Sequence, residues 1–201
     1  MSRLDRTRGF CLAALLAVVS AGAAPGGQRA TWRIAETPAE LKPAIARADL
    51  IVVEMHDALI RELTAGLDRG GPEFAMRSCH IDVAGVLQRL GRQEGIAAGR
   101  TSHRLRNPAN VPPAWAASVV RTHTGGLARD LDGFAVDLGT KVGVLRPIAQ
   151  RPMCASCHGP VEKLSPAVRA TLADRYPSDR ATGFKEGELR GWYWVEMPKE
   201  R

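Results

Sequence analysis

The stretch "FAVDLGTKVGVLRPIAQRPMCASCHGP", residues 134–160, places a predicted β-hairpin directly before two closely spaced cysteines. Two apolar runs flank Leu138-Gly139-Thr140-Lys141, and a short glycine-containing connection between such runs favours a pair of antiparallel strands. The chain then enters Cys154-Ala-Ser-Cys157-His158. Strands next to this motif exclude an all-helical domain.

Two long helices are predicted N-terminal to the hairpin. The first begins at a capping box formed by Thr37 as the cap, Pro38 in the first turn and Glu40. Apolar residues then recur every three or four positions as far as about Leu67, where "DRGGP" ends the pattern. This stripe favours packing on a core or on another helix, with coiled-coil dimerisation as the alternative. It consists of Leu41, Ile45, Ala48, Val52, Met55 and Leu59.

The second helix is predicted over about residues 72–90. Its apolar face contains Met76, Cys79, Val83, Val86 and Leu90. Cys79 therefore points inward, and His80 is turned by about 100°, to the edge of the same stripe.

The rest of the chain mixes strands with short helices. Alternation in "GRTSHRLRNP" predicts a strand that ends at Asn107-Pro108. We further expect a short helix over about residues 113–123, a helix capped by Ser165, and a last strand within residues 187–197. The predicted class is therefore α+β with an antiparallel sheet. The first of these strands would present Arg100, Ser102, Arg104 and Arg106 on one face.

The two cysteines and the histidine indicate a covalent haem. With four Cys and five His in the chain, about 0.002 chance matches to this pattern are expected. A zinc site would need a second close pair of ligands, which the sequence lacks. A thioredoxin-like dithiol opens a helix after a strand, whereas Gly159-Pro160 follows here. In haem c, the thiols of Cys154 and Cys157 become thioethers and His158 is the proximal iron ligand.

The N-terminus carries an export pattern. A basic head precedes an apolar run from Phe10 to about Ala24, which is shorter than the roughly 20 residues of a membrane-spanning helix. We predict a cleaved Sec-type signal peptide over residues 1–24, a linker over 25–37 and the haem domain over 38–198. The alternative is a retained membrane anchor. Haem c is attached outside the cytoplasm, so the expected location is periplasmic or otherwise exported.

The charge of the chain favours protein partners over nucleic acid. The formal net charge is +7, and loss of the signal peptide, with three Arg and one Asp, lowers it to about +5. In an exported protein, this excess favours acidic partners or anionic surfaces. A solvated basic face is the plainer alternative.

Removal of the signal peptide also leaves an odd number of cysteines. Cys11 leaves, while Cys79, Cys154 and Cys157 remain, and disulfides use thiols in pairs. If two of the three carry haem, Cys79 is left over. A buried cysteine is either an inert small hydrophobe or, in a haem protein, a thiolate ligand, and the pattern alone leaves both open.

Several blocks of this sequence resemble a known family. They are "GRTSHRLRNPANVPPAW", "VGVLRPI", "CASCHG" and "YPSDRATGFKEGELRGWYWVEMP". They are similar to those of a family of exported haem c domains, a catalogued domain of unknown function that also occurs in bacterial sensor proteins. The resemblance spans about residues 38–198. It implies a PAS-like antiparallel sheet with two long N-terminal helices and one covalently attached haem c.

The resemblance also implies how the iron is held. Members of this family ligate the iron between a histidine and a cysteine thiolate, which correspond here to His158 and Cys79. His80 is the alternative distal ligand. His103 and His123 are poorer candidates, because a single histidine on a strand or at a helix end is usually a surface or hydrogen-bonding residue.

Weaker expectations concern the rest of the haem pocket. Arg100, Arg104 and Arg106 are candidates for bidentate contacts to the haem propionates, with solvated edge arginines as the alternative. Trp115 and Trp192 are expected to pack in the core or against the porphyrin.

Two roles follow for a haem iron with two protein ligands. We expect no enzyme activity, since peroxidase or oxygenase chemistry needs an open position on the iron. One role is a redox or gas-sensing module, in which displacement of Cys79 moves its helix and signals to a partner protein. The other is a periplasmic electron carrier that docks on acidic redox partners. A carrier keeps both ligands in both oxidation states, whereas a sensor exchanges one.

Overall fold

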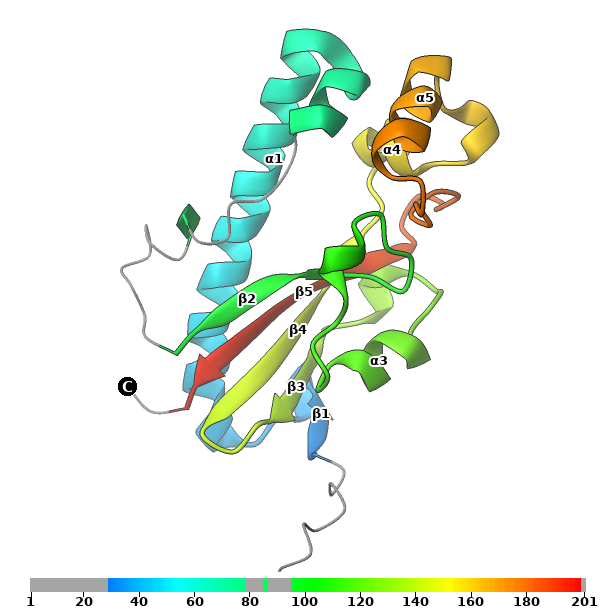
Figure 1. Ribbon diagram of the computed structural model, residues 1–201. Helices are drawn as coiled ribbons and strands as arrows, with labels where there is room; N and C mark the ends of the chain where they lie inside the picture. Colours follow the sequence, from blue (N-terminus) through cyan, green and yellow to red (C-terminus); the bar gives the residue numbers. More distant parts are fainter. Residues whose placement is uncertain (1–28, 79–84, 87–94, 200–201) are drawn as a thin grey trace, which may run out of the picture.

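The computed structural model describes residues 29–78, 85–86 and 95–199 as a single sheet flanked by helices (Figure 1). The strands are β1 (Thr31–Arg33), β2 (Ala97–Thr101), β3 (Phe134–Asp137), β4 (Lys141–Ala149) and β5 (Leu189–Pro198). The helices are α1 (Lys42–Ser78), α3 (Ala117–Thr122), α4 (Ala155–His158) and α5 (Pro166–Arg175). The predicted α+β class is confirmed.

The sheet has the order β1-β3-β4-β5-β2, and every neighbouring pair is antiparallel. The predicted hairpin of β3 and β4 lies at its centre. In the turn, the Leu138 N–H donates to the Lys141 carbonyl at 3.0 Å, and Gly139 has a φ of 84°, a left-handed conformation that favours glycine. The predicted last strand is β5, which lies between β4 and β2.

Each face of the sheet has its own core, as Figure 1 shows for α1 and α3 on opposite sides. On one face, the apolar stripe of α1 forms a buried cluster with Val144 and Val195. On the other, α3 and the neighbouring segments form a second cluster with Leu145 and Trp192. Successive residues of a strand point to opposite faces, so neighbouring residues such as Val144 and Leu145 serve different cores.

The predicted stripe and the predicted break of the first helix are both confirmed. Stripe residues Leu41, Ile45, Ala48, Met55 and Leu59 are buried, Val52 is half-buried, and Ile51 is buried beside them. Within α1, Gly70 and Gly71 leave helical geometry, and Gly71 has a φ of 73°. The chain folds back so closely that a Cβ on Gly66 would lie 2.8 Å from the Ala75 Cα.

The predicted capping box at the start of this helix is wrong. A short 3-10 turn at Ala39–Leu41 precedes Lys42, the first residue of α1. The Thr37 side chain is buried, and its Oγ1 donates to the Arg33 carbonyl at 3.2 Å. The hydroxyl therefore serves the segment before the helix rather than the helix itself.

The predicted strand over "GRTSHRLRNP" ends early, at Thr101. Ser102 Oγ donates to the Arg190 carbonyl at 2.6 Å and accepts from the Arg104 N–H at 3.0 Å. Such local side-chain bonds compete with a strand ladder, so the chain leaves the sheet here. The helix predicted over residues 113–123 is also shorter than expected: α3 covers only Ala117–Thr122.

The helix predicted to be capped by Ser165 is α5. Ser165 Oγ accepts from the Val168 N–H at 3.1 Å, which confirms the cap. The same hydroxyl donates to Glu73 of α1 at 2.9 Å. A small buried cluster reinforces this contact between α1, α4 and α5: Met76, Cys157, Leu164, Val168 and Leu172.

The N-terminal expectations meet the structure only in part. Thr31–Arg33 forms β1 and pairs with β3, so this part of the predicted linker is an edge strand of the sheet. The predicted signal peptide, residues 1–24, lies outside the described residues, as does most of the second helix beyond Ser78. In the part of the chain that the structure describes, no helix has the length and hydrophobicity to cross a bilayer.

The contact between α1 and the sheet leads to a stability prediction. Met55 is fully buried and Val53 on the same helix is 58% exposed. Met55→Ala should lower the free energy of unfolding by about 2–4 kcal/mol, because a buried side chain is lost and a cavity is left. Val53→Ala should change it by less than about 0.5 kcal/mol. Chemical denaturation of both variants tests this, and equal losses would contradict the assigned orientation of α1.

Candidate functional site

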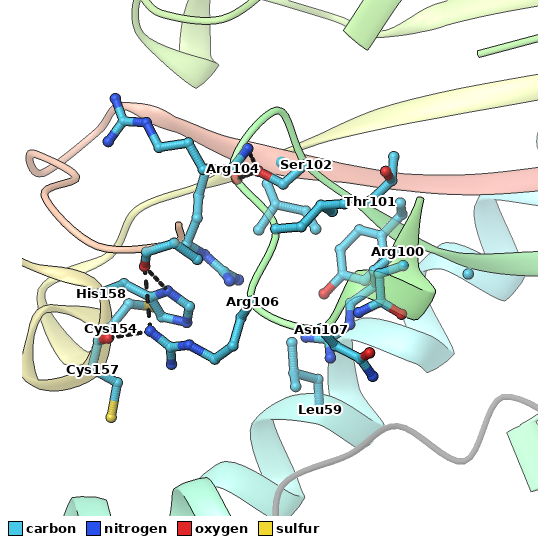
Figure 2. A pocket seen from close by; sticks show the side chains of 18 of the residues that line it. Leu59, Arg100, Thr101, Ser102, Arg104, Arg106, Asn107, Cys154, Cys157 and His158 are labelled. Atoms are coloured by element: carbon cyan, nitrogen blue, oxygen red, sulfur yellow. Dashed lines mark hydrogen bonds between the residues drawn. The ribbon is translucent and has the colours of Figure 1, made fainter. Parts of the chain in front are cut away.

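A cavity of about 590 Å³ lies where the end of α1, the end of β2, β5 and α4 meet. Its walls come from segments far apart in the sequence: α1 from His56 to Met76, residues 98–111, residues 147–158, and β5. Figure 2 shows the arginine-rich segment after β2 facing the helix with the two cysteines. The structure therefore brings the predicted Cys-x-x-Cys-His motif and the predicted arginines to one cavity.

The last four residues of the motif form α4, a helix of one turn, and Cys154 precedes it as the N-cap residue. Cys154, Cys157 and His158 all line the cavity. Cys157 is buried, Cys154 is half-buried, and both are thiols rather than a disulfide. Gly159 follows the helix in extended geometry, and only glycine fits there, because a Cβ would lie 2.6 Å from the Ala155 carbonyl oxygen.

The His158 ring is held in one tautomer. Its Nδ1 lies 2.7 Å from the Ala181 carbonyl oxygen, and a carbonyl only accepts, so Nδ1 carries the proton and donates. Nε2 is left with its lone pair. Burial lowers the pKa of His158 well below its usual range, and the positive charges of Arg106 and Arg190 lower it further. The imidazole is thus neutral, and its Nε2 has a lone pair that can bind a metal ion.

Arg106 joins α4 to two other segments. Its Nε donates to Asp179 at 3.1 Å, and its Nη2 donates to the Cys157 and Ala181 carbonyls at 2.6 and 3.3 Å. Figure 2 shows the guanidinium reaching toward Cys157 and His158. The Arg106 and Asp179 side chains are only 15% and 8% exposed. This pair is therefore a buried structural link.

Arg104 is also engaged within the protein. Its guanidinium donates to Glu188 and to the Thr182 carbonyl, both at 3.1 Å, and lies 4.3 Å from the centre of the Phe184 ring. Arg100 lines the cavity as well. Of the three predicted propionate contacts, Arg104 and Arg106 therefore have carboxylate partners in the protein itself.

Sequence reasoning missed several polar residues of the cavity, among them the cations Arg151 and Arg190. Arg190, in the last strand, lines it, as do His56 and Tyr193, whose Nδ1 and hydroxyl lie 3.2 Å apart. The available signal for Arg190 was a charged residue inside the apolar run "LRGWYW". No signal in the sequence indicated His56, because a position beside the α1 stripe is also where surface residues of a helix lie.

Other predicted residues lie elsewhere or outside the described chain. Trp115 packs on the sheet face that carries α3, where its ring covers Gly143 and its Nε1 donates to Glu196 at 2.9 Å. Trp192 is fully buried in the same core. The structure therefore does not bring either tryptophan to the cavity. Cys79 and His80, the two candidate distal ligands, lie outside the described residues.

The two poorer histidine candidates also lie away from the cavity walls. His103 packs edge-on against Phe184, and His123 Nδ1 lies 2.9 Å from the Val119 carbonyl. Met76 and Met153 both line the cavity.

The Arg106–Asp179 pair leads to a second prediction. Arg106→Gln should lower the free energy of unfolding by about 3 kcal/mol, because it leaves a buried carboxylate without its cation. The matched change is Arg61→Gln on α1, whose pair with Glu54 is 60% and 28% exposed and should cost at most about 0.5 kcal/mol. Chemical denaturation compares the two. If both variants lose the same unfolding free energy, the Arg106–Asp179 pair contributes no more than an exposed pair.

A third prediction concerns pH. Burial, followed by the charge of Arg151, lowers the pKa of His56, against the smaller opposing effect of Asp57. The folded protein therefore disfavours protonated His56, so its contribution to stability is complete above the ordinary pKa of about 6.5. It is lost as the pH falls toward the lowered value. Unfolding of the wild type, compared at about pH 7.5 and about pH 5.5, should show lower stability at the acid pH.

His56→Gln should reduce this pH dependence. Glutamine does not titrate, and its side-chain amide can still bond the Tyr193 hydroxyl. An identical loss of stability between the two pH values in the wild type and the variant would remove His56 as a source.

Comparison with known proteins places this fold and cavity in a family. The family model described as Tll0287-like matches residues 32–198, from β1 to the end of β5. Among solved structures, the chain is similar to the cyanobacterial haem protein Tll0287, with a TM-score of 0.56 and 21% identity over 77% of this chain and 94% of that chain. A search of curated proteins finds no match. The resemblance seen in the sequence blocks is thus confirmed: the chain belongs to the Tll0287-like family.

Proposed function

We propose that this chain is an exported c-type cytochrome that binds one haem covalently in the cavity beside α4. The thiols of Cys154 and Cys157 would form the thioethers, and His158 Nε2 would be an iron ligand. The observation that carries the proposal is the bond from His158 Nδ1 to the Ala181 carbonyl at 2.7 Å. A hydrogen bond of this kind is what orients metal-ligating histidines, and here it leaves the lone pair on Nε2.

The cavity has the size and lining that a cofactor of this kind needs. Its volume of about 590 Å³ lies within the range of roughly 300–1,000 Å³ typical of cofactor sites. Apolar and aromatic side chains such as Leu59, Met76 and Trp194 share the walls with a few polar groups. The similarity to a structure described as a haem protein supports the same occupant.

As the second protein ligand of the iron, we propose the Cys79 thiolate, with His80 as the alternative. Cys79 follows Met76 by three residues in the sequence, and Ala75 and Met76 line the cavity. This ligand set, the PAS-like architecture and the exported location belong to the same proposal, which the family resemblance supports. Two protein ligands would leave no open position for catalysis, so the proposed role is not enzymatic.

Haem would supply a one-electron redox centre, and the proposed role is redox or gas sensing. The supporting observation is that α1, before its break at Gly70 and Gly71, both lines the cavity with residues such as Leu59 and carries the stripe packed on the sheet. A change at its cavity end would therefore reach the core of the domain. The formal net charge of +7 favours the second candidate, an electron carrier that docks on acidic partners.

The haem proposal is tested on exported, purified protein. The wild type should show a Soret band and a mass increased by one haem that persists after denaturation. Cys154→Ala and Cys157→Ala should each weaken covalent retention, and the double variant should abolish it, because each thioether is a separate covalent bond. Colourless wild-type protein without added mass would refute the proposal.

The Cys79→Ala variant is the matched control, since it removes a thiol outside the motif. It should keep the added mass and change the ferric electron paramagnetic resonance spectrum, because the thiolate ligand is lost. An unchanged spectrum would leave the haem in place and remove Cys79 as ligand. For the wild type, exchange of a ligand on reduction favours the sensor, and retention of both ligands favours the carrier.

A further inference from the structure

The side chain of Arg190 is directed to the cavity by an irregularity in β5. Ile148 pairs with Gly191 and Ala149 pairs with Leu189, so Arg190 has no partner residue in β4. Leu189 and Trp192 consequently belong to the same core although three positions separate them. Strand alternation alone would put them on opposite faces. Such a bulge redirects side chains, and here Arg190 lies on the cavity side with Tyr193.

The bulge is fixed by close backbone contacts. A Cβ on Gly191 would overlap the Thr101 carbonyl oxygen, so only glycine fits there. The Arg190 carbonyl accepts from Ser102 Oγ at 2.6 Å. Arg190 is thus anchored through its backbone, and its side chain is placed by the sheet rather than by a flexible loop.

The guanidinium of Arg190 lacks an anionic partner within the described residues. Its Nε is completely buried and makes no hydrogen bond there. The nearby charged or titratable groups that act on it are Cys154, Arg100, Tyr193 and Arg106. Burial lowers the pKa of Arg190, and the two neighbouring cations act in the same direction. If Cys154 becomes a thioether, its capacity to carry a negative charge disappears as well.

A buried cation without a partner is costly, and the neighbouring arginines show the usual solution. Arg104 pairs with Glu188 and Arg106 pairs with Asp179, both at 3.1 Å. Arg190 differs from them because it lines the cavity without a carboxylate partner among the described residues. A carboxylate group of a ligand bound in that cavity would supply the missing partner.

We propose that Arg190 is the carboxylate-binding residue of the cavity. The assignment rests on the proposed function where the carboxylate is a haem propionate, and the same chemistry would also hold a small free carboxylate. It replaces Arg104 and Arg106, which the sequence pattern suggested for this role. The guanidinium presents its donors in a planar fork that matches a carboxylate.

The test compares wild type with Arg190→Gln, Arg190→Lys and the matched control Arg169→Gln, an exposed arginine of α5. Haem content is read from mass and Soret absorbance. The protonation of the propionates is read from the pH dependence of the midpoint potential and from the carboxylic acid band in infrared difference spectra. Acetate serves as the probe for a free carboxylate, with its binding measured by calorimetry on the same full-length samples.

If a propionate is the partner, Arg190→Gln should raise its pKa by about one to three pH units, with haem content unchanged. Arg190→Lys should give a smaller shift, and Arg169→Gln none. If a free carboxylate is the partner, wild type should bind acetate, and Arg190→Gln should weaken that binding by roughly tenfold or more.

The proposal is overturned if Arg190→Gln has the same propionate pKa and the same acetate affinity as the wild type. If the variants do not mature, the wild type alone decides. The assignment is rejected if the wild-type propionates titrate in the ordinary carboxyl range and the wild type does not bind acetate. Loss of haem from wild type would instead refute the proposed function. The acetate measurement would then judge Arg190 by itself.

Discussion

The Arg106 guanidinium holds together three segments that meet at the cavity. It bonds the carboxylate of Asp179, the carbonyl of Cys157 in α4, and the carbonyl of Ala181. The Ala181 carbonyl also accepts from His158 Nδ1, so the position of the histidine ring depends on the same loop that Arg106 fixes. Because the Arg106–Asp179 pair is largely removed from water, its donors have few alternatives to this one arrangement.

The dependence on Arg106 follows from how short α4 is. A helix of four residues does not form by itself, and α4 spans only Ala155–His158. Bonds from elsewhere hold it: the Gly183 N–H donates to the Gly159 carbonyl at 2.8 Å, and the Phe184 N–H donates to the His158 carbonyl at 3.0 Å. The segment between α5 and β5 is therefore a structural support for the motif, although it contains no element of regular structure.

The sequence predicted the features that local chemistry determines. Glycine at Gly139 and Gly71 set the central turn and the helix break, and periodicity identified the face of α1 that packs on the sheet. The Cys-x-x-Cys-His spacing located one wall of the cavity. Each of these sequence features lies within a few residues of the structure that it determines. Local sequence was therefore sufficient to predict it.

The roles of the arginines could not be predicted in this way. Arg104 and Arg106 line the cavity although the strand ends before them at Thr101. Their partners, Glu188 and Asp179, are 84 and 73 residues away. Arg190 was hidden because the bulge changes the phase of its strand. Like charges gathered at one buried place repel each other unless anions balance them. Among the described residues, Arg104 and Arg106 already have carboxylate partners and hold the cavity wall together, whereas Arg190 has none and is therefore the candidate to bind an anionic ligand.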